Sequence, residues 1–431
     1  MKKKKRRLKI SSLIAIIVLS FLLFLVIFFL TNNLSFIGKK SVHSDAKAYK
    51  TRHCLIFYPD SKTGSDYAKE MCKGVKDDSI YDYQLIPYGD YYQVSYGGDN
   101  RYFVDKDFNS LEINEISDEG KTIILDYLRY SLKKDSPEKY YNSKSISSIN
   151  LESIDFSTLT YSINNEYLRV NIPQHEIDID VPLKYMQKQL NMNFGYQDEL
   201  YSKPTYLDTS GNHPIICITF DDGPEFWDGP GESSSEKIIN LLYKYDATAT
   251  FYVVGTNLEN RDTWSDYQTY NLLKRSINQG NEYGSHTQTH KYELTELSTA
   301  DEIRKEINGP IDYMYKFLEY KVNTYRPVQG VFNQNVLDAQ PVGAILWDVD
   351  SEDWLSMDPD TIYNRIMSVE YEDGDILIFH DIYDETYEAL ERIIPELIDQ
   401  GCQLVTVSEM LKGINIDVNK LSYYYGPGYY E

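Results

Sequence analysis

Short strand-like runs alternate with amphipathic stretches over the second half of the chain, from about residue 213 onwards. Each run is largely apolar and bounded by turn-forming residues, which predicts strands over 215–220, 248–254, 282–285, 324–326, 344–349, 375–379 and 403–407. Apolar residues recur with a helical period between them, which predicts helices over 233–243, 266–279, 299–318, 361–369 and 387–400. Such alternation is typical of an α/β fold with a parallel sheet, and the number of strands favours a barrel, complete or incomplete.

The preceding segment, residues 51–205, mixes strands and helices without regular repetition. Alternating apolar and polar residues predict half-buried strands such as 91–96 and 166–172, whereas 121–132 and 182–190 have the pattern of helices. No group of residues in this segment has the spacing of a catalytic or metal site. We therefore expect a small α+β domain of unknown role, which is either one folding unit or two.

The N-terminus carries a basic cluster followed by an uncharged apolar run. Seven of the first nine residues are Lys or Arg, and residues 10–30 contain no charged residue. A run of this length can cross a bilayer as a helix, and a basic cluster before it stays in the cytoplasm. The sequence thus predicts a cytoplasmic segment 1–9, a single-pass transmembrane helix 10–30 in the cell membrane, a stalk 31–50 and an extracellular remainder. The alternative is a cleaved signal peptide, whose apolar region is typically shorter and ends in a small-x-small site that this run lacks.

Composition narrows the classes of partner. With 42% hydrophobic and 25% charged residues, the chain has the composition of a globular protein. Its net charge of −23 opposes binding to a polyanion through phosphate contacts, so nucleic acid is excluded as a main partner. No pattern indicates a protein partner.

The four cysteines suit an exported chain without requiring disulfides. Cys54 and Cys72 flank one short segment and are candidates for a pair, whereas Cys217 and Cys402 lie in apolar runs and are expected to be buried thiols. Because four cysteines allow three full connectivities, the pairing stays open. The Tyr-rich residues 416–431 are expected to form a flexible end.

Two carboxylates and two histidines follow different predicted strands. Asp221 and Asp222 precede a turn-forming Gly-Pro, which can direct both groups into one pocket, although Asp-Asp-Gly-Pro alone is as often only a loop. His286 and His290 follow the third strand, and residues four apart lie on the same side of a helical turn. Asp222 and the two histidines offer the nitrogen and oxygen ligands of a catalytic zinc site. A chance surface pair of histidines is the alternative.

Three later strand ends add further polar groups. Arg326 begins an Arg-Pro-Val-Gln-Gly turn, Asp350 and Trp354 lie in an acidic run, and His380 follows an apolar strand. Taken singly, Arg326 can be a structural ion-pair partner, Trp354 a core or rim residue, and His380 a satisfied loop histidine. Five such elements at successive strand ends indicate one active site, because barrel enzymes place their chemistry on those loops.

These five motifs together resemble those of the polysaccharide deacetylase family, the NodB-homology or carbohydrate esterase family 4 enzymes. The resemblance covers roughly residues 210–412 and implies a distorted (β/α) barrel in a domain over 206–415. It implies a divalent cation, with Zn²⁺ first and Co²⁺ or another divalent ion as alternatives. The implied residue roles are Asp222, His286 and His290 as metal ligands, Asp221 as catalytic base, His380 as general acid, Asp350 as the residue that tunes His380, and Arg326 as the partner that orients Asp221.

The third motif departs from the family's usual Arg-Pro-Pro-Tyr-Gly, since residues 326–330 of this chain read Arg-Pro-Val-Gln-Gly. The family uses the backbone N–H at the aromatic position to hold the oxyanion, and Gln329 retains that donor. The different side chain is expected to alter the groove wall and the substrate preference. The resemblance further implies that Trp354 and Ile378 line the pocket that receives the acetyl methyl group.

The expected substrate follows from the expected location. An exported, membrane-tethered member of this family meets cell-wall glycan first, so the acetamide of N-acetylglucosamine in peptidoglycan is the leading substrate, with acetate and an amine as products. Family analogy then implies resistance to lysozyme. One alternative is another N- or O-acetylated polysaccharide. The other is a non-catalytic wall-binding protein on the same fold, against which the intact set of acids and histidines argues.

Overall fold

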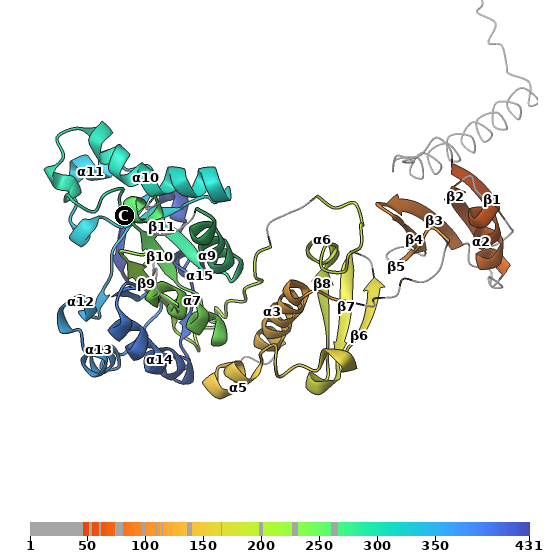
Figure 1. Ribbon diagram of the computed structural model, residues 1–431, viewed down its shortest axis with the longest axis horizontal. Coiled ribbons are helices and arrows are strands. Elements are labelled where there is room, and N and C mark those ends of the chain that lie inside the picture. Colours follow the sequence, from red (N-terminus) through yellow and green to blue (C-terminus); the bar gives the residue numbers. More distant parts are fainter. Residues whose placement is uncertain are drawn as a thin grey trace, which may run out of the picture. The chain divides into compact units, whose positions relative to one another are not determined.

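The computed structural model describes residues 46–50, 54–59, 62–73, 81–96, 100–107, 111, 113, 115–135, 140–164, 166–197, 201–225, 232–259 and 266–431 (Figure 1). The predicted cytoplasmic segment 1–9, the predicted span 10–30 and the stalk up to residue 45 lie outside these residues. Among the described residues, no helix has the length and apolar character needed to cross a membrane. The described residues divide into two compact units, one with those up to 111 together with 163, 164 and 193–195, and the other with the rest.

The first unit is built on a small sheet of mixed direction. Its elements are β1 (Ala46–Lys50), β2 (Cys54–Pro59), α2 (Lys62–Lys73), β3 (Tyr81–Tyr88), β4 (Tyr91–Tyr96) and β5 (Asn100–Val104). β2 and β3 pair in parallel, and the other neighbours in this series pair antiparallel. β4 confirms the strand predicted over 91–96. Helix α2 buries Gly64, Ala68 and Cys72, which are spaced four apart and therefore share one face. Cys72 is disulfide-bonded, whereas Cys217 and Cys402 are free and buried, as predicted for the two core thiols.

The second unit begins with helices and a hairpin. The elements are α3 (Asp118–Asp135), α5 (Ser143–Ser148), η1 (Phe156–Thr158), β6 (Thr160–Asn164), β7 (Tyr167–Ile172), η2 (Pro173–His175), β8 (Ile177–Pro182) and α6 (Leu183–Met186). The last two residues of β6 are assigned to the first unit. β7 and β8 pair antiparallel and alternate between buried and outward-facing positions, the pattern of a strand with one covered face. The helix predicted over 182–190 is wrong in length, because α6 ends at Met186 and turns follow it.

The remainder of the second unit contains a largely parallel sheet with covering helices. Its strands are β9 (Ile215–Asp221), β10 (Thr250–Val253), β11 (Glu282–Ser285), β12 (Thr324–Tyr325), β13 (Gly343–Ile345), β14 (Val349–Asp350), β15 (Ile376–His380), β16 (Gln403–Leu404), β17 (Tyr423–Gly426) and β18 (Tyr429–Tyr430). The order is β14-β15-β9-β10-β11-β12-β13-β17-β18, with β16 paired to β9. Every residue of β9 is buried because neighbouring strands flank it and both faces of the sheet are covered.

The strand predicted over 344–349 is in fact two strands. Residues 343–345 pair with β12, whereas 349–350 pair with β15 near the other end of the sheet order. Only residues 346–348 connect them, and three residues span about 11 Å at most. The two regions must therefore lie close together, so the sheet curls into an incomplete barrel, as the α/β barrel prediction anticipated.

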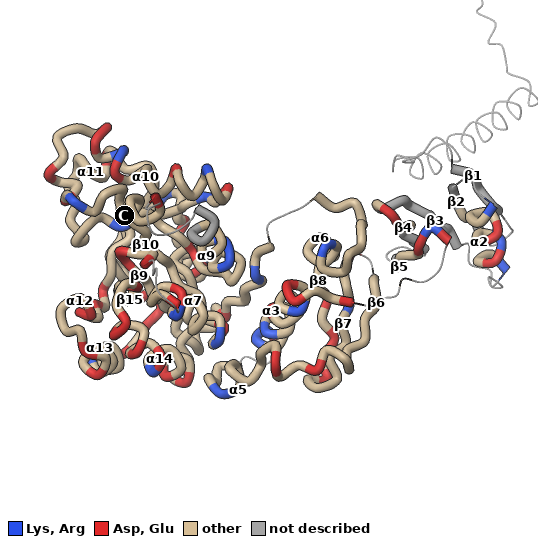
Figure 2. The backbone as a smooth tube through the Cα atoms, in the orientation of Figure 1, with Lys and Arg blue, Asp and Glu red and all other residues tan. Residues whose placement is uncertain are grey.

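The helices around this barrel largely begin and end where the sequence predicted. They are α7 (Ser234–Lys244), α8 (Gly255–Leu258), α9 (Asp266–Asn278), α10 (Ala300–Leu318), α11 (Gln334–Ala339), α12 (Asp353–Ser356), α13 (Pro359–Ile366), α14 (Asp384–Asp399) and α15 (Val407–Gly413), with 3₁₀ turns η3 (Leu294–Glu296), η4 (Val328–Gly330) and η5 (Val418–Lys420). α10 starts at a complete capping box, in which Thr299 and Glu302 each accept from the other's backbone N–H. Figure 2 shows many acidic residues on α12, α13 and α14, which contribute to the negative net charge.

The Tyr-rich C-terminal segment is ordered rather than flexible. β17 pairs in parallel with β13, which would otherwise be an edge of the sheet. Tyr424 is buried and its hydroxyl donates to the Gly374 carbonyl at 3.0 Å. Alternation of buried and outward positions along β17 is the pattern of a strand, so the expectation of a loose end over 416–431 is wrong.

Candidate metal centre and active site

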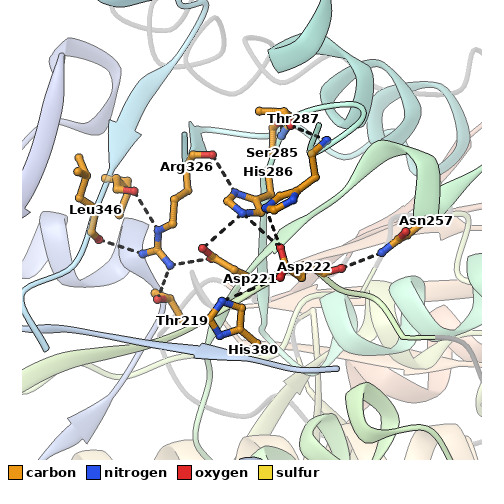
Figure 3. A network of polar contacts seen from close by, with 12 residues as sticks. Thr219, Asp221, Asp222, Asn257, Ser285, His286, Thr287, Arg326, Leu346 and His380 are labelled. Atoms are coloured by element: carbon orange, nitrogen blue, oxygen red, sulfur yellow. Dashed lines mark hydrogen bonds and ion pairs between the residues drawn. The ribbon is translucent and has the colours of Figure 1, made fainter. Parts of the chain in front are cut away.

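Six of the predicted site residues lie together at one edge of the barrel, namely Asp221, Asp222, His286, His290, Arg326 and His380. In the parallel register, His380 at the end of β15 lies opposite Asp221 at the end of β9, and Tyr325, next to Arg326, lies opposite Ser285, next to His286. Parallel strands present their carboxyl ends at the same edge, so the polar residues that follow them converge. Figure 3 shows Asp221, Asp222, His286 and His380 directed toward one another.

Asp222, His286 and His290 place one ligand atom each within 4.8 Å of one another. Asp222 Oδ1 lies 3.1 Å from His290 Nε2 and 3.5 Å from His286 Nε2. Bonds of about 2.0–2.2 Å to a tetrahedral ion would separate such ligand atoms by about 3.3 Å. The same Asp222 oxygen is buried and has no hydrogen-bond partner. A carboxylate oxygen and two imidazole nitrogens at this spacing, one of them otherwise unsatisfied, fit a divalent cation.

The loop that carries the histidines is irregular. Thr287 and His290 both have left-handed backbones, with φ of 69° and 51°, so the predicted helical turn is wrong. The two imidazole rings nevertheless lie with their centres 4.8 Å apart. His286 Nδ1 lies 2.9 Å from the Arg326 carbonyl, which can only accept, so Nδ1 carries the proton and Nε2 is free to bind a cation. Burial lowers the pKa of His286 and outweighs the charges of Asp221 and Asp222, which raise it. The lowered pKa favours the neutral imidazole.

Arg326 is fully buried and fixes the orientation of Asp221. Its Nη1 donates to Asp221 Oδ1 and to Thr219 Oγ1, both at 2.8 Å. Its Nε and Nη2 donate to the carbonyls of Ile345 and Leu346 at 3.0 and 2.9 Å. Asp221 Oδ2 remains on the side of the ligand cluster, 3.6 Å from His286 Nε2. One carboxylate oxygen is therefore anchored while the other can receive a proton.

Asp353, rather than the predicted Asp350, is the partner of His380. The Asp350 carboxylate instead accepts the backbone N–H of Glu352 at 2.8 Å. His380 Nδ1 lies 2.8 Å from Asp353 Oδ1, and Asp353 Oδ2 accepts from the His380 backbone and from the Thr386 hydroxyl. Burial alone would lower the pKa of His380, but the hydrogen bond and charge of Asp353, with Asp221 and Asp222, raise it to about 9. His380 is thus held as a cation at neutral pH, with Nε2 4.0 Å from Asp222 Oδ2.

Replacing Asp353 with asparagine should lower the pKa of His380 from about 9 to its ordinary value of 6.5 or below, because burial then acts with less opposition. NMR titration of the His380 ring in the metal-free protein measures this directly. Since the wild-type pKa is raised, the stability contributed by the pair is complete below pH 6.5 and is lost as the pH rises through about 9. The variant should lack that decline, and an unchanged His380 titration would refute the assigned partnership.

The three predicted substrate-binding residues lie in different environments. Gln329 is exposed and has a left-handed backbone with φ of 55° in the turn after Arg326. Trp354 is 51% exposed on α12, directly after Asp353. Ile378 is buried within β15. Two of these residues are thus open to a ligand, while Ile378 belongs to the packed sheet.

The sequence interpretation missed Asp353 and Thr219. Asp353 stands in the same acidic run as Asp350, directly before Trp354, but strand and loop boundaries decide which acid faces His380. Thr219 lies two positions before Asp221, on the same face of β9. A polar residue at that position of a fully buried strand was the available signal that Thr219 belongs to the site.

Comparison with known proteins places these residues in a family. The polysaccharide deacetylase family profile matches residues 208–341. Peptidoglycan-N-acetylmuramic acid deacetylase PdaC of Bacillus subtilis is 30% identical over 66% of this chain and 55% of that protein. Its solved structure matches with a TM-score of 0.42 and 33% identity, covering 48% of this chain and 94% of that chain.

Two further relatives carry the name peptidoglycan-N-acetylglucosamine deacetylase. PgdA of Listeria monocytogenes is 30% identical over 48% of this chain and 40% of that protein. A protein of Bacillus cereus is 31% identical over 47% of this chain and 90% of its own length. The chain thus spans about half the length of PdaC and less than half of PgdA, but nearly the whole of the Bacillus cereus protein. The chain belongs to the polysaccharide deacetylase family.

Proposed function

We propose that this protein is a metal-dependent hydrolase that removes acetyl groups from amino sugars of peptidoglycan. The observation that carries the proposal is the convergence of Asp222, His286 and His290 on one point, with Asp221 and His380 next to the cluster. An anchored carboxylate and a cationic histidine beside a cation site form the acid and base pair that amide hydrolysis needs.

Each group has a distinct task in this proposal. A divalent cation bound at the site supplies a Lewis acid that polarises the acetyl carbonyl and lowers the pKa of water. Asp221, held by Arg326, takes the proton of the attacking water through Oδ2. The Gln329 backbone N–H donates to the developing oxyanion. His380, kept protonated by Asp353, gives its Nε2 proton to the departing amine.

We propose the acetamide of N-acetylglucosamine as the substrate group, with peptidoglycan met at the outer face of the membrane that residues 10–30 would span. Two of the relatives are named for that sugar. N-acetylmuramic acid is the second candidate, because PdaC, which is named for it, aligns with 66% of this chain, more than the 48% aligned with PgdA.

Mass spectrometry of muropeptides separates the two sugars. Purified peptidoglycan is incubated with the full-length protein and Zn²⁺, digested, and the lost acetyl group is assigned by fragmentation. We expect the loss on N-acetylglucosamine; loss on N-acetylmuramic acid would replace that substrate with the second candidate. Acetate released only from O-acetylated xylan or from another acetylated polysaccharide, or from no glycan although metal is bound, would reject a peptidoglycan deacetylase.

A further inference from the structure

The short helix α8 ties together both loops that carry metal ligands, although it contributes no ligand itself. It follows β10, the strand between β9 and β11. Four donors of residues 254–257 reach the neighbouring loops: Val254 N to Gly223 O at 3.0 Å, Gly255 N to Thr287 O at 3.0 Å, Thr256 N to Gln288 O at 2.8 Å, and Asn257 Nδ2 to Asp222 O at 2.7 Å. The first and last bonds hold the aspartate loop, and the middle two hold the histidine loop.

α8 also fits closely against the histidine loop. A Cβ added at Gly255 would lie 2.1 Å from Gln288 Oε1 and 3.0 Å from the Gln288 Cα. The second of these atoms is backbone and cannot rotate away. The segment around residue 255 therefore lies in direct contact with the loop between the two histidines, and its position relative to them is fixed.

Asn257 supplies the only one of the four bonds that comes from a side chain. Its acceptor, the Asp222 carbonyl, belongs to a residue with φ of 71°, a left-handed conformation that is uncommon outside glycine and that persists where the surroundings hold it. Figure 3 shows Asn257 bonded to the backbone of Asp222, away from His286 and His380. The bond thus fixes the peptide that determines where the Asp222 carboxylate points.

We propose that Asn257 is a positioning residue for the metal centre, which holds the Asp222 loop so that its carboxylate meets His286 and His290. The inference rests on the proposed function only in requiring that these three residues bind a divalent ion. Asn257 is not one of the three candidate ligands and bonds to the main-chain carbonyl of Asp222 rather than to its carboxylate, so its effect should be on metal affinity. A variant that lacks the Asn257 side-chain donor should therefore reach the turnover of the wild type when the metal is saturating.

The test is a Zn²⁺ titration against a competing chelator dye, using full-length wild type, Asn257→Ala and Asn257→Asp. The aspartate variant keeps the size of the side chain but replaces the N–H donor with an acceptor that repels the carbonyl. We expect both variants to bind about tenfold more weakly, since removing an outer partner of a metal site typically costs about 10- to 100-fold in affinity. The matched control is Asn323→Ala, whose part-buried Nδ2 bonds to Ser408 Oγ near the start of β12, at the other end of the strands, and it should bind as wild type does.

The outcomes separate this inference from the proposed function. Wild-type affinity in both Asn257 variants, or equal weakening in the Asn323 control, would overturn the positioning role whether or not the protein deacetylates glycan. A wild type that binds Zn²⁺ but releases no acetate would reject the function and leave the titration decisive for Asn257. A wild type that binds no divalent ion would overturn both. If the kcat of the Asn257 variants stayed low at saturating Zn²⁺, Asn257 would have a role other than positioning, and the proposal would also be contradicted.

Discussion

Asp221→Asn is expected to lower deacetylation by about a thousandfold while the divalent ion stays bound. A general base typically contributes about 10²- to 10⁴-fold to the rate, and asparagine cannot accept the proton. The amide oxygen can still accept from Arg326 Nη1, which now donates to Asp221 Oδ1 at 2.8 Å, so the arrangement of the site should survive. The measurement is kcat for acetate release together with the metal content of the purified variant.

The matched control for this variant is Asp360→Asn. Asp360 is an acid on α13 whose side chain is 75% exposed and pairs with Arg392, so its loss should change neither turnover nor metal content. If Asp221→Asn lost its metal together with its activity, Asp221 would be a ligand and its assignment as base would be withdrawn.

Asp222→Ala is expected to abolish both metal binding and turnover. Removing Asp222 Oδ1 leaves only His286 and His290, and losing a direct ligand should weaken binding by more than the roughly 100-fold that follows loss of an outer partner. Metal affinity is read by chelator competition, and activity by acetate release. The expected contrast with Asp221→Asn is that metal and turnover are lost together.

A second variant distinguishes the loss of the carboxylate ligand from a change in the backbone at position 222. The left-handed φ of 71° at position 222 is less costly for asparagine than for alanine. Asp222→Asn should therefore keep the loop while weakening the ligand, and it should bind metal less tightly than wild type. Full metal affinity in Asp222→Asn would show that the carboxylate is not a ligand, whatever the alanine variant does.

The sequence predicted the barrel and the convergence of Asp222, His286 and His290, because buried strands and the motifs at their ends can be recognised in short segments. Buried runs such as 215–220 end next to Asp221 and Asp222, and parallel pairing brings such ends to one edge. The predicted start of α10 near Thr299 agrees with the structure, where Thr299 forms a capping box with Glu302, three residues away. These features depend on spacing that can be read within a few residues.

Other features depended on contacts between distant segments. The irregular loop at His290 needs left-handed residues that are not glycine, for which the sequence has no clear signal. Whether Asp350 or Asp353 reaches His380 depends on where β14 ends and α12 begins. Residues 423–426 form strand β17 because they pair with the otherwise unpaired edge of β13, although the two segments are about 80 residues apart in the chain.

The most direct test is acetate release from purified peptidoglycan by the full-length protein after chelation, followed as Zn²⁺ is added back. We predict no release from the chelated protein and a return of activity that reaches its plateau at one bound ion per chain. Undiminished release from metal-free protein, or no release with the ion bound, would contradict a deacetylase that works through a cation held by Asp222, His286 and His290.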